Sequence, residues 1–172
     1  MFALSRPRSP RRGLAALAAL ALLGPLGAAP PAAHAASARS GFGLGLVLGE
    51  PTGLSAKAWL SGGSALQFHV SWDFTDAALV LSGDYLVHLD VLGVHTPDLD
   101  LLLTLGGGVK VGQHTQRAHE EPLFVGLRVP IGLSMPFKSM PLELFLEAVP
   151  GLRVLSKIGF DVDLGLGARW FF

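Results

Sequence analysis

The sequence predicts an all-β fold, an eight-stranded antiparallel transmembrane up-and-down β-barrel, and three observations lead to this prediction. The last fifteen residues, 158–172, alternate apolar residues with Gly or charged residues and end on Phe172. Because strand side chains alternate between two faces, one face of this stretch suits hydrocarbon and the other a tight polar interior. The chain is 50% hydrophobic, yet beyond its amino-terminal region it has no apolar run of roughly 18 residues, as a membrane helix needs. Seven further stretches alternate in the same way, which gives an even number of strands.

The amino-terminal 35 residues have the organisation of a secretory signal peptide. An arginine-rich region at 6–12 precedes ten apolar residues, 14–23, and an A-x-A cleavage site at 33–35. The apolar run is too short for a membrane anchor. Although Arg11 and Arg12 are adjacent, no bulky apolar residue follows them directly, so we expect general secretion rather than the twin-arginine route.

Cleavage at this site divides the chain into three parts. Residues 1–35 are the cleaved signal peptide, residues 36–40 a short periplasmic segment, and residues 41–172 the eight-stranded barrel. Four of the 13 basic residues and none of the 13 acidic ones lie in the signal, so the exported part carries a net charge of −4. This charge argues against nucleic acid as a partner. The chain has no Cys, which excludes disulfides and thiolate metal sites, and we expect no metal and no cofactor.

The first three expected strands are 41–49, 54–60 and 65–74, joined by turns at 50–53 and 61–63. The first turn, with the glycine before it, forms a hairpin motif: Gly49, Glu50, Pro51, Thr52 and Gly53. The third strand alternates most clearly. Its apolar face consists of Leu66, Phe68, Val70, Trp72 and Phe74, and its polar face of Gln67, His69, Ser71 and Asp73.

The next four expected strands are about 79–89, 101–111, 123–134 and 142–152, with a turn at 135–141 before the last of them. Each alternates with period two, although an apolar run blurs the start of the 101–111 strand. The terminal strand follows. We expect its apolar face to serve as the membrane-insertion signal, formed by Phe160, Val162, Leu164, Leu166, Trp170 and Phe172.

A soluble β-sandwich also has alternating strands, so it is the main alternative fold. In a sandwich, however, the polar faces point outward and are rich in Lys and Glu. Here the minor faces carry Gly, Ser and isolated charges, and only 15% of the residues are charged. This composition suits a narrow lumen and favours the barrel.

Eight strands enclose an interior just wide enough for side chains to fill. The inward positions hold acidic and basic residues, and buried charges must be paired. We therefore expect a lumenal plug of ion pairs and hydrogen bonds rather than an open pore. Trp59 shares the inward parity of Lys57 and should stack over the lysine stem or the barrel floor. The expected lumenal polar network consists of Lys57, Asp73, Asp84, Lys110, Arg128, Glu143, Glu147, Asp161, Asp163 and Arg169.

The signal peptide, the alternating strands and the terminal Phe172 together resemble the OmpA/OmpX-type small outer-membrane barrels. More narrowly, GLGLVLGEPTGLSAKAWL, residues 43–60, resembles the opening hairpin of a small outer-membrane barrel family of unknown function named from a spirochaete member. The resemblance implies a bacterial outer-membrane location with both termini in the periplasm. It also implies that the barrel-assembly machinery reads the last strand. It supplies no catalytic residues.

Two features allow an enzymatic or metal-binding alternative. His69 and Ser71 lie on one strand face, as in the lipid A deacylases, but here the pair has lumenal parity and Trp72 follows the serine. His114, His119, Glu120 and Glu121 cluster in the expected 112–122 loop, but their spacing suits neither a helix face nor a strand face, so we interpret it as an exposed loop.

The function predicted from the sequence is therefore that of a small integral outer-membrane barrel with a structural or surface-interaction role. Its expected partners are outer-membrane lipid and the assembly machinery, and it is expected to be a monomer and not an enzyme. A lipid-modifying enzyme and a narrow passage for small solutes or ions are the alternatives. The expected external connections are short, which limits the area available to a protein partner.

Overall fold

The structure, a computed structural model, describes residues 39–74, 78–114, 123–155 and 158–172. The expected signal peptide and most of the expected histidine-containing loop, including His119, lie outside these residues. Within them, no helix has the length and apolar character needed to cross a membrane.

Nine β-strands make up the described part of the chain. They are β1 (Phe42–Glu50), β2 (Thr52–Ser61), β3 (Ser64–Asp73), β4 (Ala78–His95), β5 (Asp100–His114), β6 (Leu123–Arg128), β7 (Ile131–Pro136), β8 (Leu142–Leu155) and β9 (Gly159–Phe171).

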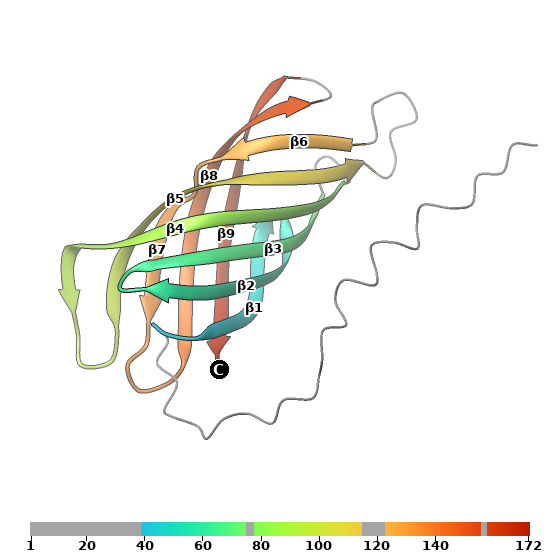
Figure 1. Cartoon of the computed structure of the whole chain (residues 1–172). Coiled ribbons are helices and arrows are strands. Elements are labelled where there is room, and N and C mark those ends of the chain that lie inside the picture. The colour runs from blue at the N-terminus through green and yellow to red at the C-terminus, as the bar shows by residue number, and fades with distance from the viewer. Residues whose placement is uncertain (1–38, 75–77, 115–122, 156–157) are drawn as a thin grey trace, which may run out of the picture. The chain divides into compact units, whose positions relative to one another are not determined.

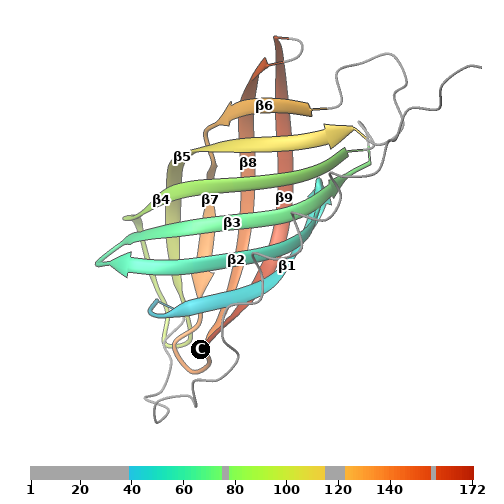
Figure 2. The same ribbon diagram turned by 45° about the vertical axis from the view of Figure 1, so that its right-hand side comes forward.

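The strands form one antiparallel sheet that closes into a ring (Figures 1 and 2). Each strand pairs with the next along the chain from β1 to β5, and β5 pairs with both β6 and β7, which in turn pair with β8. Strands β8 and β9 then pair, and β9 pairs with β1 from Gly43↔Phe171 to Glu50↔Leu164, which closes the ring. The expected all-β barrel with eight staves is thus confirmed, with β6 and β7 together forming one stave.

The expected continuous strand 123–134 is wrong in one respect, because it is interrupted at Val129 and Pro130. Proline has no N–H to donate to a strand ladder, so the regular pairing stops there. Two hydrogen bonds hold the interruption in the wall: Val129 N–H donates to Pro150 O at 2.9 Å, and Gly106 N–H donates to Pro130 O at 2.9 Å. Strands β6 and β7 therefore continue one another in the same stave.

The expected strands 79–89 and 101–111 are too short, because β4 and β5 continue as a hairpin. Their pairing shifts between Leu89 and Val94 and resumes at Val94↔Leu101 and His95↔Asp100. We call this extension, residues 90–101, the lip. Figure 1 shows it bent away from the main run of β4 and β5.

The two ends of the barrel differ in what they carry. The first and last described strands meet where Phe172 N–H donates to Phe42 O at 2.9 Å. The lip and the β2–β3 and β7–β8 turns lie at this same end, which we call the terminal end. Strands β1, β3, β5 and β8 all run to the opposite end, the loop end.

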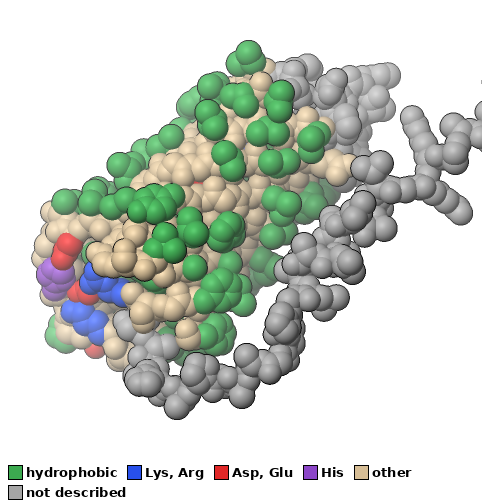
Figure 3. Space-filling model, viewed as in Figure 1, with side chains coloured by type: hydrophobic (Ala, Val, Ile, Leu, Met, Phe, Trp, Pro, Cys, Tyr) green, Lys and Arg blue, Asp and Glu red, His purple; other side chains and the backbone are tan. Residues whose placement is uncertain are grey.

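The exterior of the barrel is apolar and the interior polar. Large apolar side chains are exposed along the strands, and Figure 3 shows them spread over the outer wall, with charged side chains gathered near the lip. The side chains expected to form the insertion signal all lie on this outer face of β9 or just beyond it. Phe160, Val162, Leu164, Leu166, Trp170 and Phe172 are between 47% and 70% exposed.

Candidate functional site

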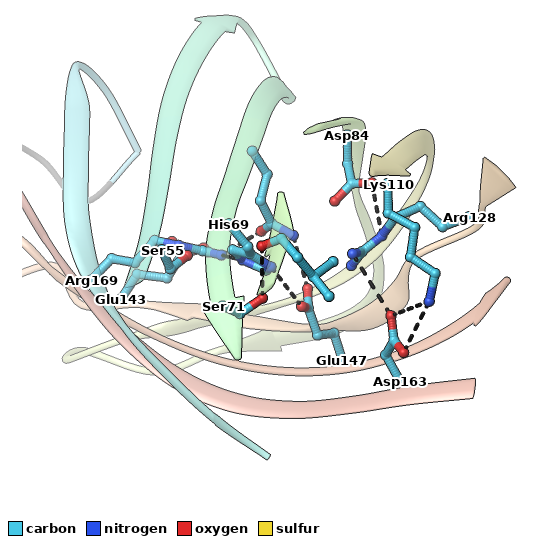
Figure 4. Close-up of polar contacts among 12 residues, drawn as sticks. Ser55, His69, Ser71, Asp84, Lys110, Arg128, Glu143, Glu147, Asp163 and Arg169 are labelled. Carbon is cyan, nitrogen blue, oxygen red and sulfur yellow. Dashed lines mark hydrogen bonds and ion pairs between the residues drawn. The ribbon is translucent and has the colours of Figure 1, made fainter. Parts of the chain in front are cut away.

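The candidate site is the polar interior of the barrel, where side chains from opposite walls meet (Figure 4). Two groups can be distinguished by their contacts. The terminal cluster consists of Ser55, Lys57, Gln67, His69, His88, Ser134, Glu143, Glu147 and Arg169. The loop cluster consists of Asp84, Lys110, Arg128, Arg153, Asp161 and Asp163.

Glu143 is the centre of the terminal cluster and is fully buried. One carboxylate oxygen lies 2.5 Å from Lys57 Nζ and also accepts a hydrogen bond from the Ser134 hydroxyl. The other oxygen accepts from Arg169 Nη1 at 3.2 Å. Strands β2, β7 and β9 supply these partners to a carboxylate on β8. Since a buried carboxylate is strongly penalised without partners, this arrangement holds four staves together.

Arg169 uses each of its guanidinium nitrogens and its planar face. Its Nε donates to Ser55 Oγ at 2.7 Å, and its Nη2 donates to Gln67 Oε1. The guanidinium carbon also lies 3.6 Å from the centre of the Phe145 ring, a cation–π contact. The planar fork of Arg suits it to such simultaneous contacts.

A direct bond joins opposite walls of the barrel. Gln67 Nε2 on β3 donates to Glu147 Oε2 on β8 at 2.9 Å. In the ring order, β3 and β8 are four strands apart in either direction, the greatest separation that eight staves allow. His69 Nδ1 lies 3.6 Å from the other oxygen of Glu147, and its Nε2 faces Arg169 Nη2 at 3.4 Å. Because guanidinium can only donate, Nε2 accepts and the ring proton belongs on Nδ1, toward Glu147.

His88 holds the ammonium group of Lys57 in place near the terminal end of the barrel. Lys57 Nζ donates to His88 Nε2 at 2.7 Å, and His88 Nδ1 donates to Gly63 O at 3.1 Å. Both contacts are satisfied by one neutral tautomer. Trp59 covers this pair, with its ring 4.4 Å from Lys57 Nζ and 4.3 Å from the His88 ring. The Trp59 ring therefore lies against the Lys57 ammonium group, on the inward face that its parity predicts, and it is tilted by 44° to the His88 ring.

The loop cluster pairs its charges differently. Lys110 Nζ lies 3.0 Å from Asp161 Oδ2 and 3.1 Å from Asp163 Oδ2. Arg128 lies between Asp84, at 3.1 Å from Nε to Oδ1, and Asp163, at 3.8 Å from Nη1 to Oδ2. Arg153 reaches Asp161 at 3.5 Å nearer the loop end.

The two clusters are balanced in charge. In the terminal cluster two basic side chains face two carboxylates, and in the loop cluster three face three. A cavity of about 10 Å³ remains between the clusters, lined in part by His69, Glu147, Arg128 and Asp163. A space of this size holds about one water molecule. Charges paired in this way can hold opposite walls of the barrel together.

The structure places the ten expected network residues as follows. Eight are buried: Lys57, Asp84, Lys110, Arg128, Glu143, Glu147, Asp163 and Arg169. Asp161 is half-buried but joins the loop cluster, and Asp73 is half-buried at the loop end of β3. Sequence reasoning omitted the uncharged members Ser55, Gln67, His69, His88 and Ser134. Their inward parity was the available signal, and their roles depend on contacts that sequence does not show.

The hairpin motif forms a tight turn at the loop end of β1 and β2. Thr52 Oγ donates to Gly49 O at 2.7 Å and accepts from Gly49 N–H at 3.0 Å. The Glu50 carboxylate accepts a hydrogen bond from Phe74 N–H at 2.5 Å, which ties the turn to the end of β3. The motif therefore joins three staves.

A second group of charges, which sequence reasoning did not identify, lies on the lip beyond the barrel wall. Asp100 accepts a hydrogen bond from His95 Nδ1 at 2.8 Å, and Lys138 Nζ lies 2.9 Å from the same oxygen. These two contacts lower the pKa of the Asp100 carboxyl from 3.8 to about 2, and the hydrogen bond from His95 has the larger effect. Lys138 Nζ also donates to Thr96 O at 2.8 Å, so the lip is fastened to the β7–β8 turn.

Among the described residues, no three His, Cys, Asp or Glu side chains lie close enough together to hold a metal ion. Of the histidine cluster expected at 112–122, His119, Glu120 and Glu121 lie outside the described residues.

Comparison with known proteins gives one structural likeness. No protein-family model matches the sequence, and no curated protein matches it. The fold is similar to that of the N-terminal β-barrel domain of Pseudomonas aeruginosa OprF, with a TM-score of 0.57. The two are 15% identical, and the likeness covers 76% of this chain and 96% of that one. It shows that the chain has the fold of an outer-membrane β-barrel.

Proposed function

We propose that this protein is a small integral barrel of the bacterial outer membrane with a lumen closed by side chains. Its role in this proposal is structural, as part of the membrane wall, or the presentation of its loop end to the surroundings. The continuous apolar exterior supports insertion in a bilayer, because an exposed apolar surface of this extent is unfavourable in water. Both termini then lie in the periplasm, and the chain acts as a monomer.

The main support for a closed lumen is the hydrogen bond between Gln67 and Glu147. It crosses the barrel between strands that are as far apart as the ring permits. Above and below it, the Glu143 and Lys110 ion pairs fill the same interior. A solute would have to break several buried, charge-assisted contacts to pass, which costs several kcal/mol at each one.

The proposal assigns no catalysis to His69 and Ser71. The Ser71 hydroxyl donates to Val80 O at 3.5 Å, and the His69 ring nitrogens face Glu147 and Arg169. A nucleophile needs its base within hydrogen-bond reach and room for a substrate carbonyl beside it. Both side chains are instead buried in the interior.

We also propose a family and an assembly route for this chain. The hairpin motif at 49–53 and the alternating last strand support membership of the spirochaete-named small barrel family and recognition of β9 by the barrel-assembly machinery. The motif's cross-link from Glu50 to β3 gives it a structural role that a family signature would preserve.

A matched pair of arginine substitutions tests membrane insertion. Leu164→Arg places a charge at mid-strand on the outer face of β9, whereas Ile158→Arg places one just before the strand, where the side chain is 84% exposed. An arginine costs about 2–4 kcal/mol at the bilayer midplane and about 0–1 kcal/mol near the interface. We expect Leu164→Arg alone to lose heat-modifiable migration and recovery in the outer-membrane fraction. Equal recovery of both variants, or recovery of the native chain in the soluble periplasm, would contradict the proposal.

Planar-bilayer recording tests the closed lumen separately. The native chain, once its heat-modifiable form is inserted, should give no regular conductance steps. Stable steps of uniform size would instead support the alternative of a narrow passage for ions or small solutes.

A further inference from the structure

The outer wall of the barrel carries an apolar groove near the loop end that the interior network does not involve. The groove crosses β1 to β4 and has a volume of about 360 Å³, within the range of small-molecule sites. The outward side chains that line it are those of Leu46, Leu48, Leu54, Val70, Trp72 and Leu79.

The strand register explains the form of the groove. Leu46, Leu54 and Val70 lie side by side on three neighbouring strands and form one outward row. Trp72 and Leu79 are paired residues of β3 and β4 and form part of the next outward row. Between the two rows lies the backbone of Val47, Gly53 and Ser71, paired residues whose side-chain positions face the lumen.

The groove presents hydrocarbon almost throughout. Among the described residues that line it, none is charged, and the two hydroxyl groups are engaged elsewhere. Thr52 Oγ bonds both the N–H and the carbonyl of Gly49, and Ser71 Oγ donates to Val80 O. A polar ligand would therefore find few partners and would lose its own contacts with water.

We propose that this groove binds one hydrocarbon chain of a bilayer lipid in the leaflet at the loop end. The inference rests on the proposed membrane location, and two observations commit it to a lipid chain. The groove is continuous with the apolar wall formed by Leu46, Leu48 and Leu54, and it runs between two neighbouring rows of outward side chains. A groove left empty in hydrocarbon forfeits dispersion contacts, so a flexible chain is the occupant that fills it.

The uncharged lining also predicts how selective the groove is among lipid headgroups. Because the described lining residues include no basic or acidic side chain, binding depends on the acyl chain and not on the headgroup. The hairpin motif gains a second role, because its Thr52 and Gly53 form part of the lining that contacts the lipid.

Trp72 allows a direct test, since it borders the groove. The full chain with Trp59→Phe and Trp170→Phe keeps Trp72 as its one tryptophan, and Trp59→Phe with Trp72→Phe keeps the outward-facing Trp170 as the control. Each protein, in dodecyl maltoside micelles, is titrated with phosphatidylcholine that carries bromine on its acyl chains. We expect saturable quenching of Trp72, half complete at a lipid mole fraction about fivefold lower than for Trp170. Equal quenching of the two tryptophans at every mole fraction would overturn the proposal.

A second pair of variants removes the groove without adding charge. Val70→Phe fills it, while Val109→Phe makes the same change at a similarly exposed outward position on β5. In the Trp72 background, only Val70→Phe should abolish the saturable quenching, and brominated phosphatidylglycerol should match phosphatidylcholine. Retained quenching in Val70→Phe, or a requirement for the anionic lipid, would sink the idea. Heat-modifiable migration of every variant reports insertion independently, so failure of the proposed membrane location is distinguishable from failure of the groove.

Discussion

At the scale of single residues, the contribution of each buried charged side chain to the stability of this barrel depends on how many oppositely charged partners it has. Glu143 contacts both Lys57 and Arg169, whereas Glu147 contacts the uncharged Gln67 and the neutral tautomer of His69. Both carboxylates are on β8 and both face inward. Removing charge from Glu143 would leave two cations buried with only dipolar partners, and buried unpaired charges are among the costliest defects in a protein.

The same substitution at both positions tests this difference. Glu143→Gln should lower the free energy of unfolding by about 3–5 kcal/mol, because Lys57 and Arg169 lose their counter-ion. Glu147→Gln should cost about 1 kcal/mol, because its amide oxygen can still accept from Gln67. Urea titrations in micelles, followed by tryptophan fluorescence, measure both. Similar losses for the two variants would show that counter-ions do not dominate the interior.

At the scale of elements, the closing seam between β1 and β9 is the joint that turns a sheet into a barrel. The two strands approach closely at Gly45, where a Cβ would lie 1.8 Å from Ala168 O. A contact this short with backbone cannot be relieved by a rotamer change, so the strands would have to separate. Gly107 on β5 is different, since a Cβ there meets nothing within 4 Å.

Alanine substitutions at these two glycines distinguish the stability cost of disturbing the closing seam from the cost of replacing any strand glycine. Gly45→Ala should destabilise the barrel by about 1–3 kcal/mol through backbone displacement at the seam. Gly107→Ala should stay within about 0.5 kcal/mol of the native protein, as an exposed substitution without clashes does. The fraction of heat-modifiable barrel remaining along a urea series gives both values. A stable Gly45→Ala barrel would mean that the seam is looser than its contacts indicate.

At the scale of the whole molecule, the two ends of the barrel are chemically distinct. The terminal end joins the first and last described strands and carries the lip, which Asp100 and Lys138 fasten to the neighbouring turn. The opposite end is where β1, β3, β5 and β8 finish. The proposed function places the terminal end in the periplasm and the loop end outside.

Cysteine labelling tests this orientation, because the native chain has no Cys and gives no background. Leu155→Cys lies at the loop end of β8 and Ser61→Cys at the terminal end of β2, and both positions are exposed. A membrane-impermeant maleimide should label Leu155→Cys on intact cells and Ser61→Cys only after the outer membrane is opened. The reverse pattern would invert the proposed topology.

Much of the fold follows from local information. Period-two alternation assigns each side chain to one face, and this holds for the outward apolar residues of β9 as well as for buried charges such as Arg169 and Glu143. The interruption at Pro130 could also have been expected, because proline cannot donate to a ladder. The lip could not, since its irregular pairing between Leu89 and Val94 breaks the period on which strand prediction relies.

The all-β class, the face of each strand and the inward placement of charges could all be predicted from the sequence, because they depend only on the order of residues along one strand. The sequence did not determine which charges meet. The bond from Gln67 to Glu147 joins residues 80 positions apart, and the three partners of Glu143 come from three other strands. Such contacts depend on the stagger between strands and on ring closure, which only the tertiary structure fixes. The apolar groove has the same origin, since it is formed by rows of side chains across four strands.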